Sequence, residues 1–347
     1  MRPRELIFGA LAVTLLGIYA ACGSQLYATV GPSVVPTAMP TVPRVEVPAP
    51  KVPGTLAFAI QGDIFVIRDG HMNHQTAEGR NQQPALSVDG WVVLFSRRGQ
   101  IDGRSRLATG QVVNAQLGFA DLVSKPSAGG AETVLVPGLR RRDAAGGFHE
   151  VSWFLSPALS ADGRRLAFIE DDGRGAADLV VMDLGTRRRT ILSRGADLAD
   201  TAWSPDGRSI VTTSYNTDPP GLVIWAADRA GSGQRVARLP GGEAYRASFS
   251  PDGSSLVYTL RQGNRNDVHL VEIASGRDVA LTSDGRSWNG VLSPDGRWVA
   301  FLREQGGVIE LYAMELGEAL SGGSPKAPIK LTKGQGIDGA SRPAWAQ

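Results

Sequence analysis

Apolar and polar residues follow one another in short runs along most of the chain, and these runs predict β-strands. The runs are rich in valine, leucine, isoleucine and aromatic residues and are bounded by glycine and aspartate. Two successive sets of three runs have the same order: 255–260, 267–273 and 278–282, then 298–303, 308–314 and 328–332. We find no sustained helical spacing of apolar residues. The pattern predicts an all-β protein.

One turn motif recurs along the chain. Ser-Pro-Asp-Gly is intact in 203–214, 249–260 and 292–303, and altered in 86–96 and 159–169. Its aspartate stands at positions 89, 162, 206, 252 and 295, which are 73, 44, 46 and 43 residues apart. Proline presets the φ of a type I turn and glycine tolerates a positive φ, so we interpret the motif as a hairpin turn and not as a catalytic serine. A period near 44 with four strands per repeat is typical of a β-propeller.

The two ends of the repeat region complement each other. Residues 342–347 match 200–205, and residues 54–58 resume where that match stops. The last segment should therefore supply the innermost strand of the first blade, which removes an exposed sheet edge. We expect a six-bladed β-propeller of four-stranded blades over residues 54–347.

These repeats, with Leu-Thr at 281–282 and 331–332, resemble the TolB-type (WD40-like) β-propeller repeat. The resemblance covers residues 54–347 and implies a fold without a particular activity. TolB carries an α/β domain ahead of its propeller, whereas this chain has a proline-rich segment there, so a place in the Tol–Pal system does not follow. Related propellers occur in serine hydrolases, but the sequence contains no G-x-S-x-G elbow.

The N-terminus predicts export. Residues 6–21 form an uncharged apolar run after a charged start, which fits a signal peptide and is shorter than the about 20 residues of a membrane-spanning helix. Ala20-Ala21-Cys22 resembles a lipobox, although Tyr19 replaces the usual leucine. We expect a lipoprotein-type signal peptide at 1–21 and lipidation of Cys22. An uncleaved anchor and ordinary cleavage near Ala21 are the alternatives, and both also export the domain.

Residues 22–53 are rich in proline and should form a semi-rigid tether. The expected location is therefore extracytoplasmic and membrane-anchored, in the periplasm or on the outer face of the cytoplasmic membrane.

Composition argues against several classes of function. A net charge of +2 disfavours a nucleic-acid binder, and the single cysteine excludes an internal disulfide or a cysteine-based zinc cluster. His71 and His74 have metal-pair spacing, but no third ligand is near them in sequence. We place them at the hairpin before an outer strand. We predict no catalytic residue, metal or cofactor.

One set of residues is a candidate site. The residue three positions before Trp203, and its counterparts in the other repeats, are all polar: Arg342, Gln83, Ser156, Asp200, Arg246 and Asn289. If the inner strands line a central channel, these side chains surround one mouth of it. Two arginines and one aspartate could hold an anionic or zwitterionic group. The alternative is a hydrated channel with polar walls.

Two insertions, Arg97–Gly118 and Gly138–His149, should lie on the same side as this ring. Long loops on a rigid scaffold often carry recognition. The second insertion contains Arg140-Arg141-Arg142, which forms either a basic patch or a solvated charge run.

The sequence favours a protein-binding or scaffolding module of the bacterial cell envelope, with an envelope or membrane-complex protein as partner. The alternative is a propeller enzyme or ligand-binding protein that acts on a small molecule or sugar at the channel mouth.

Overall fold

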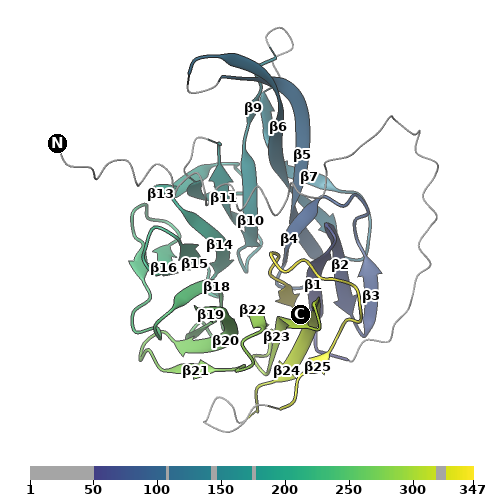
Figure 1. Cartoon of the computed structure of the whole chain (residues 1–347), viewed down its shortest axis with the longest axis vertical. Coiled ribbons are helices and arrows are strands. Elements are labelled where there is room, and N and C mark those ends of the chain that lie inside the picture. The colour runs from purple at the N-terminus through teal and green to yellow at the C-terminus, as the bar shows by residue number, and fades with distance from the viewer. Residues whose placement is uncertain (1–50, 107–108, 142–146, 174–176, 318–325) are drawn as a thin grey trace, which may run out of the picture. The chain divides into compact units, whose positions relative to one another are not determined.

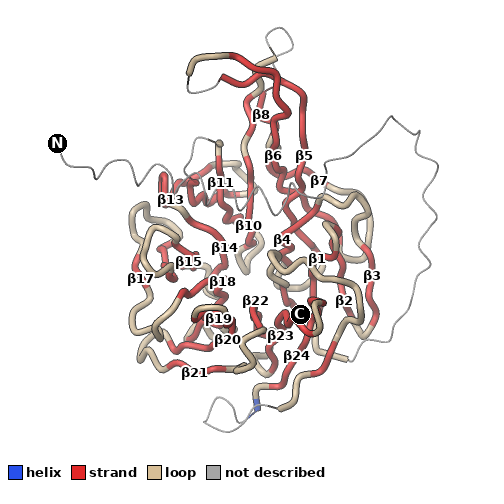
Figure 2. Tube along the Cα trace, in the orientation of Figure 1, coloured by secondary structure: helices blue, strands red, loops and turns tan. Residues whose placement is uncertain are grey.

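The computed structural model describes residues 51–347 except 107–108, 142–146, 174–176 and 318–325. The predicted signal peptide, Cys22 and nearly all of the tether lie outside these residues. The described part consists of strands and turns arranged around a common centre (Figures 1 and 2). No helix among the residues described is long and apolar enough to cross a membrane.

Four sheets of the ring have four antiparallel strands each. The first contains β26 (Ala344–Ala346), β1 (Thr55–Ile60), β2 (Asp63–Arg68) and β3 (His71–His74). The second contains β14 (Leu198–Trp203), β15 (Ser209–Ser214), β16 (Gly221–Ala226) and β17 (Gln234–Arg235). The third contains β18 (Glu243–Phe249), β19 (Ser255–Gln262), β20 (Arg265–Glu272) and β21 (Asp278–Ala280). The fourth contains β22 (Ser287–Leu292), β23 (Trp298–Gln305), β24 (Val308–Glu315) and β25 (Ile329–Lys330).

The second and third repeats share one eight-stranded sheet. The second repeat supplies β4 (Asn81–Leu86), β5 (Val92–Arg106), β6 (Val112–Pro126) and β7 (Thr133–Val136). The third supplies β10 (Trp153–Leu159), β11 (Arg165–Asp171), β12 (Ala177–Asp183) and β13 (Arg189–Ala196). The expectation of six separate four-stranded sheets is therefore wrong here. The reason is local. Beside the insertions, β10 pairs in parallel with β6, with Trp153 opposite Ala120, and this pairing joins the two repeats.

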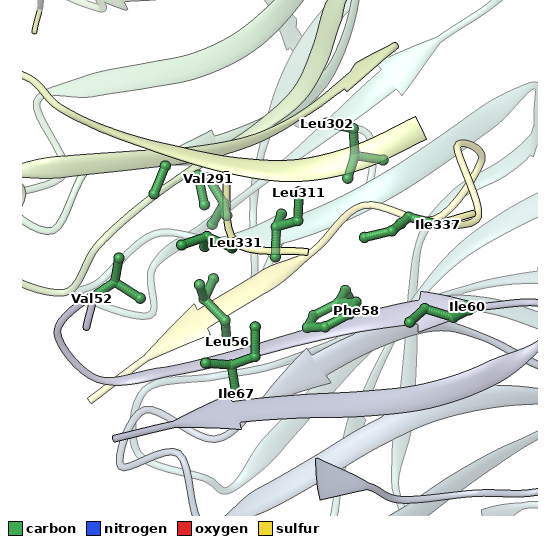
Figure 3. Packing of buried hydrophobic residues seen from close by; sticks show 12 residues of the cluster. Val52, Leu56, Phe58, Ile60, Ile67, Val291, Leu302, Leu311, Leu331 and Ile337 are labelled. Atoms are coloured by element: carbon green, nitrogen blue, oxygen red, sulfur yellow. The ribbon is translucent and has the colours of Figure 1, made fainter. Parts of the chain in front are cut away.

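The predicted ring closure is confirmed. β26 pairs antiparallel with β1, with Leu56 opposite Trp345. The indole nitrogen of Trp345 donates a hydrogen bond to the Pro53 carbonyl at 2.6 Å. Figure 3 shows the buried cluster beneath this seam, where Phe58 packs among side chains from the first and last sheets of the ring. Val52 is also buried in this cluster, two residues before the expected start of the domain.

The three Ser-Pro-Asp-Gly turns and their two altered copies share one hydrogen-bond pattern. In the second of the three intact copies, Ser250 Oγ donates to Asp252 Oδ1 at 2.5 Å and accepts the N–H of Ser255 at 2.9 Å. Asp252 Oδ1 also accepts the N–H of Ser254 at 3.1 Å, and Gly253 has a φ of 73°. In four turns the serine hydroxyl is the largest influence holding the aspartate pKa below its usual value: Asp89, Asp162, Asp206 and Asp252. The serine is thus a turn residue, as predicted.

These turns should make the fold acid-sensitive. Because the pKa of each carboxyl is lowered on folding, its contribution is present above the unfolded pKa of about 3.9 and is lost as pH falls through the lower folded value. Urea unfolding across this range should show the free energy of unfolding falling below about pH 4. Asp252→Asn should reduce that pH dependence, and Asp228→Asn, at an exposed site outside these turns, should leave it unchanged. Equal pH dependence in both variants and the parent would contradict this assignment.

The Leu-Thr motif of the fourth strand has its own structural role. Thr282 Oγ1 accepts the N–H of Val268 at 2.9 Å and donates to Asp267 at 3.1 Å. In the last repeat, Thr332 makes the same two kinds of contact with Leu311 and Glu310. The threonine follows the fourth strand, and its hydroxyl ties this part of the chain to the third strand.

Candidate functional site: the inner-strand ring and the arm

The six predicted ring residues lie at equivalent places near the start of the innermost strands. Five of them have the left-handed backbone conformation at φ of 51–59°: Gln83, Ser156, Asp200, Arg246 and Asn289. Each lies in a β-bulge, because the register of its strand shifts at that point. A bulge re-aims side chains and interrupts strand pairing. Arg342 is the exception: it precedes β26, and its φ is not positive.

The bulges connect neighbouring repeats. Each left-handed residue donates its backbone N–H to a side-chain oxygen of the repeat before it. Gln83 donates to Ser341 Oγ at 2.8 Å, Ser156 to Gln83 Oε1 at 2.8 Å, and Asp200 to Ser156 Oγ at 3.3 Å. Arg246 donates to Thr213 Oγ1 and Asn289 to Thr259 Oγ1, both at 2.9 Å. This belt of hydrogen bonds explains the polar side chains of Gln83 and Ser156, which are also acceptors in it. It gives part of the predicted ring a structural role.

Sequence reasoning missed the acceptors on the second strands. Thr213 and Thr259 occupy the same position, the tenth residue counted from the serine of the turn motif. An alignment of the repeats shows that both positions carry a hydroxyl. Only the structure shows that this hydroxyl accepts a hydrogen bond from the next blade.

Three charged side chains meet at the centre of the ring. The guanidinium of Arg342 donates to the carbonyls of Thr201, at 3.0 Å, and of Ala247, so it reaches across the centre from the first repeat to the fourth and fifth. Arg246 Nη1 bonds the side chain of Asn289 at 2.8 Å. Its Nε lies 3.8 Å from Asp200 Oδ1, and the two side chains are 15% and 13% exposed.

The cluster holds two guanidiniums for one carboxylate. Burial lowers the pKa of Arg342 from its usual value; the Asp200 carboxylate opposes this effect and the Arg246 charge adds to it. The centre of the ring therefore carries an excess of positive charge in partly buried surroundings, where a charge–charge interaction is stronger than in water.

The first predicted insertion is a regular hairpin and not an irregular loop. β5 and β6 run past the ring as two paired strands, with Arg106 opposite Val112 at the far end. Figure 1 shows this hairpin projecting from the ring. We call residues 98–106 and 112–119 the arm. Asn81, at the start of β4, pairs with Arg97 at the base of the arm. The arm therefore projects from the same end of the second repeat that carries Gln83, as predicted.

The second insertion lies along the arm. It contains β8 (Leu139–Arg141), which pairs with β9 (Glu150–Val151) directly after the insertion. Arg104 N–H donates to the Gly147 carbonyl at 2.7 Å. Arg140 bonds Glu170 at 3.0 Å, while Arg141 is exposed 3.9 Å from Glu150. Of the predicted basic run, Arg142 lies outside the described residues.

The histidine pair has a structural environment. His71 and His74 lie in the outer strand β3 itself, which corrects the predicted place at the hairpin before it. The His74 ring stacks on Phe65 at 4.3 Å and lies 3.7 Å from Asp63. Among the residues that the structure describes, no three histidine, cysteine, aspartate or glutamate side chains are placed so that they could hold a metal ion. The prediction that the protein has no metal or cofactor stays a prediction.

The fold and the closed seam define a β-propeller protein. The TolB beta propeller domain model matches residues 140–347, more than half of the chain. The chain therefore belongs to the TolB β-propeller family.

Curated relatives match shorter stretches. A TolB protein of the Tol-Pal system from Anaeromyxobacter dehalogenans (strain 2CP-C) is 38% identical over 100 residues, 28% of this chain and 22% of that protein. The Chromobacterium violaceum protein of the same description is 31% identical over 150 residues, 40% of this chain and 33% of that protein. The chain thus spans between about a fifth and a third of the length of these two relatives.

Solved structures share the fold. TolB from Acinetobacter baumannii matches with a TM-score of 0.62 at 20% identity, covering 84% of this chain and 66% of that chain. A putative TolB from Agrobacterium tumefaciens matches with a TM-score of 0.60 at 16% identity, covering 84% and 92%.

Proposed function

We propose that this protein is a lipid-anchored, extracytoplasmic β-propeller that binds a protein of the bacterial cell envelope. Family membership and relatives named as Tol-Pal system proteins support an envelope partner. The apolar run and Cys22 support export and anchoring. In this proposal residues 1–21 are removed, 22–53 form the tether, and the eight-stranded sheet counts as two blades of a six-bladed ring.

We further propose that the partner binds at the end of the ring that carries Asp200, Arg246 and Arg342. The observation that carries this proposal is the excess of guanidinium over carboxylate in that cluster. A carboxylate of the partner would complete the charge balance through forked hydrogen bonds. Gln83, Ser156 and Asn289 belong to the belt of bulges at the same end of the repeats.

A membrane crosslinking pull-down tests the proposal. The full-length protein should enrich one envelope protein, identified by mass spectrometry, and Arg246→Ala should reduce its affinity for the purified domain by roughly tenfold. Arg208→Ala, in an exposed turn at the opposite end of the repeat, is the matched control and should bind normally. Unfolding temperatures of both variants show whether the fold is intact.

Two outcomes would count against parts of the proposal. Equal binding by Arg246→Ala and the parent would exclude the charged cluster as the binding site. The parent should incorporate labelled palmitate and Cys22→Ala should not, and equal incorporation by both would exclude lipid anchoring at Cys22.

A further inference from the structure

Arg342 differs from the other ring residues in what its side chain binds. It precedes the closing strand β26, and its guanidinium donates to two main-chain carbonyls of other repeats, that of Thr201 at 3.0 Å and that of Ala247. These two residues directly follow Asp200 and Arg246 in the sequence. The guanidinium of Arg342 therefore binds the main chain beside both of the other charged residues at the centre of the ring.

Both carbonyls lie in β-bulges. The strand register shifts at the two places, between β14 and β15 and between β18 and β19. A bulge leaves its extra residue unpaired and disrupts the strand ladder locally. Thr201 and Ala247 are each 1% exposed, so solvent cannot supply the donors that the ladder lacks there. Because a buried carbonyl needs a hydrogen-bond partner, Arg342 provides what the two bulges require.

The guanidinium also fixes the spacing of the two bulges. Its N–H groups point in set directions within one plane, so two carbonyls that it binds are held at a constant separation. The chain around Arg342 is itself held in place. Ser341 N–H donates to the Asp338 carbonyl at 2.9 Å, and Pro343 is buried. Arg342 thus joins the first repeat rigidly to the fourth and the fifth.

The donors of Arg246 are directed toward side chains and toward the centre. Its Nη1 bonds the Asn289 side chain at 2.8 Å and the Gly339 carbonyl at 3.0 Å, and its Nε lies 3.8 Å from Asp200 Oδ1. Among the residues that the structure describes, Nη2 of Arg246 has no hydrogen-bond partner. Since this side chain is 15% exposed, Nη2 is the donor of the cluster that an incoming group can use.

We propose that Arg342 is a positioning residue, which holds the bulges of Asp200 and Arg246 so that Arg246 Nη2 meets a single carboxylate of a partner. The contact with a partner rests on the proposed function, whereas the positioning of the two bulges does not. Arg342 acts through the main chain and does not touch the partner. Its removal should therefore disturb Arg246 even when no partner is present.

NMR spectra of the arginine Nε–Hε groups in the full chain test the positioning role without a ligand. Arg342→Lys keeps the charge but offers a single nitrogen, which cannot hold two carbonyls at a fixed spacing. It should shift the Arg246 Nε–Hε signal, identified by its absence in Arg246→Ala, and speed exchange of that proton with solvent by roughly tenfold.

Arg165→Lys is the matched control. Arg165 donates to the Gly207 carbonyl at 2.7 Å, at the opposite end of the fourth repeat, so its replacement should leave the Arg246 signal in place. Unfolding temperatures of both variants show whether the fold is intact. An Arg246 signal that is unchanged in Arg342→Lys, or that changes equally in both variants, would overturn the proposal.

Sodium propionate, a probe with one carboxylate, separates positioning from contact. In the parent the Arg246 signal should shift as propionate is added, and the Arg342 Nε–Hε signal should stay in place. Arg342→Lys should weaken propionate binding at Arg246 by roughly tenfold although the charge is kept. Shifts of both signals in the parent would make Arg342 a contact residue and overturn the proposal. An unmoved Arg246 signal in the parent would count against the proposed carboxylate site, and the variant spectra would still decide the positioning role.

Discussion

Removal of the last four residues should strongly destabilise the propeller. A variant that ends at Pro343 loses β26, and with it the pairing to β1 and the Trp345 bond to Pro53. Trp345 is partly buried against the cluster at the seam, and Ala346 is buried beside it. Loss of one fully buried tryptophan side chain typically costs about 3–5 kcal/mol, and this truncation removes the β1 pairing together with both side chains. The free energy of unfolding, measured in urea, should therefore fall by at least about 4 kcal/mol.

Gln347→Ala provides the matched control for this truncation. The residue is exposed, and its hydrogen bonds to Val88 and Thr55 use its backbone N–H and carbonyl. That substitution should change the free energy by no more than about 0.5 kcal/mol. A synthetic peptide of residues 340–347 should partly restore the stability of the truncated protein. Unfolding of the truncated protein at the parental urea concentration would contradict the role assigned to the seam.

Substitution of Glu310 should be the most costly single change of a charged residue. Its side chain is 1% exposed, 3.1 Å from Lys330 Nζ and 2.6 Å from Thr332 Oγ1, and it also accepts the N–H of Gly334. Glu310→Ala leaves these donors without their acceptor and should lower the free energy of unfolding by roughly 3 kcal/mol. Glu243→Ala is the control, because that residue is 43% exposed and forms a surface pair with Arg261 worth about 0–1 kcal/mol.

The same residue should contribute to the pH dependence of stability. Burial alone would raise the pKa of Glu310, but the Thr332 and Gly334 bonds and the Lys330 charge outweigh it and hold the pKa below its usual value. Its contribution is therefore present above the unfolded pKa of about 4.3 and is lost as pH falls through the folded pKa. The difference between Glu310→Gln and the parent should shrink on acidification. A constant difference down to pH 3 would contradict this interpretation.

Local chemistry made much of the fold predictable. Proline, aspartate and glycine in one four-residue motif specify a turn from residues adjacent in sequence, and Gly253 and its counterparts show the positive φ that the motif requires. The match between residues 342–347 and 200–205 predicted ring closure, because equivalent segments occupy equivalent strands. The period did not reveal that repeats two and three share a sheet, since the Trp153–Ala120 pairing depends on how the insertions fold back.

The candidate site was predictable in composition but not in contacts. Alignment of the repeats brought the six polar positions together, and five of them share one backbone conformation. It did not show that Gln83 and Ser156 accept bonds from the next blade, or that Arg342 crosses to Thr201 and Ala247. Those partners are distant in sequence, and their identity depends on the distance and rotation between neighbouring blades.

The sequence by itself determined the repeat, the turns, the strand order within a repeat and the seam, because each depends on residues close in sequence or on equivalence between repeats. The tertiary structure decided which charges meet at the centre of the ring and that the first insertion forms a paired hairpin. The reason is physical: hydrogen bonds and ion pairs depend on distances of a few ångströms between side chains, and closure of the ring sets those distances.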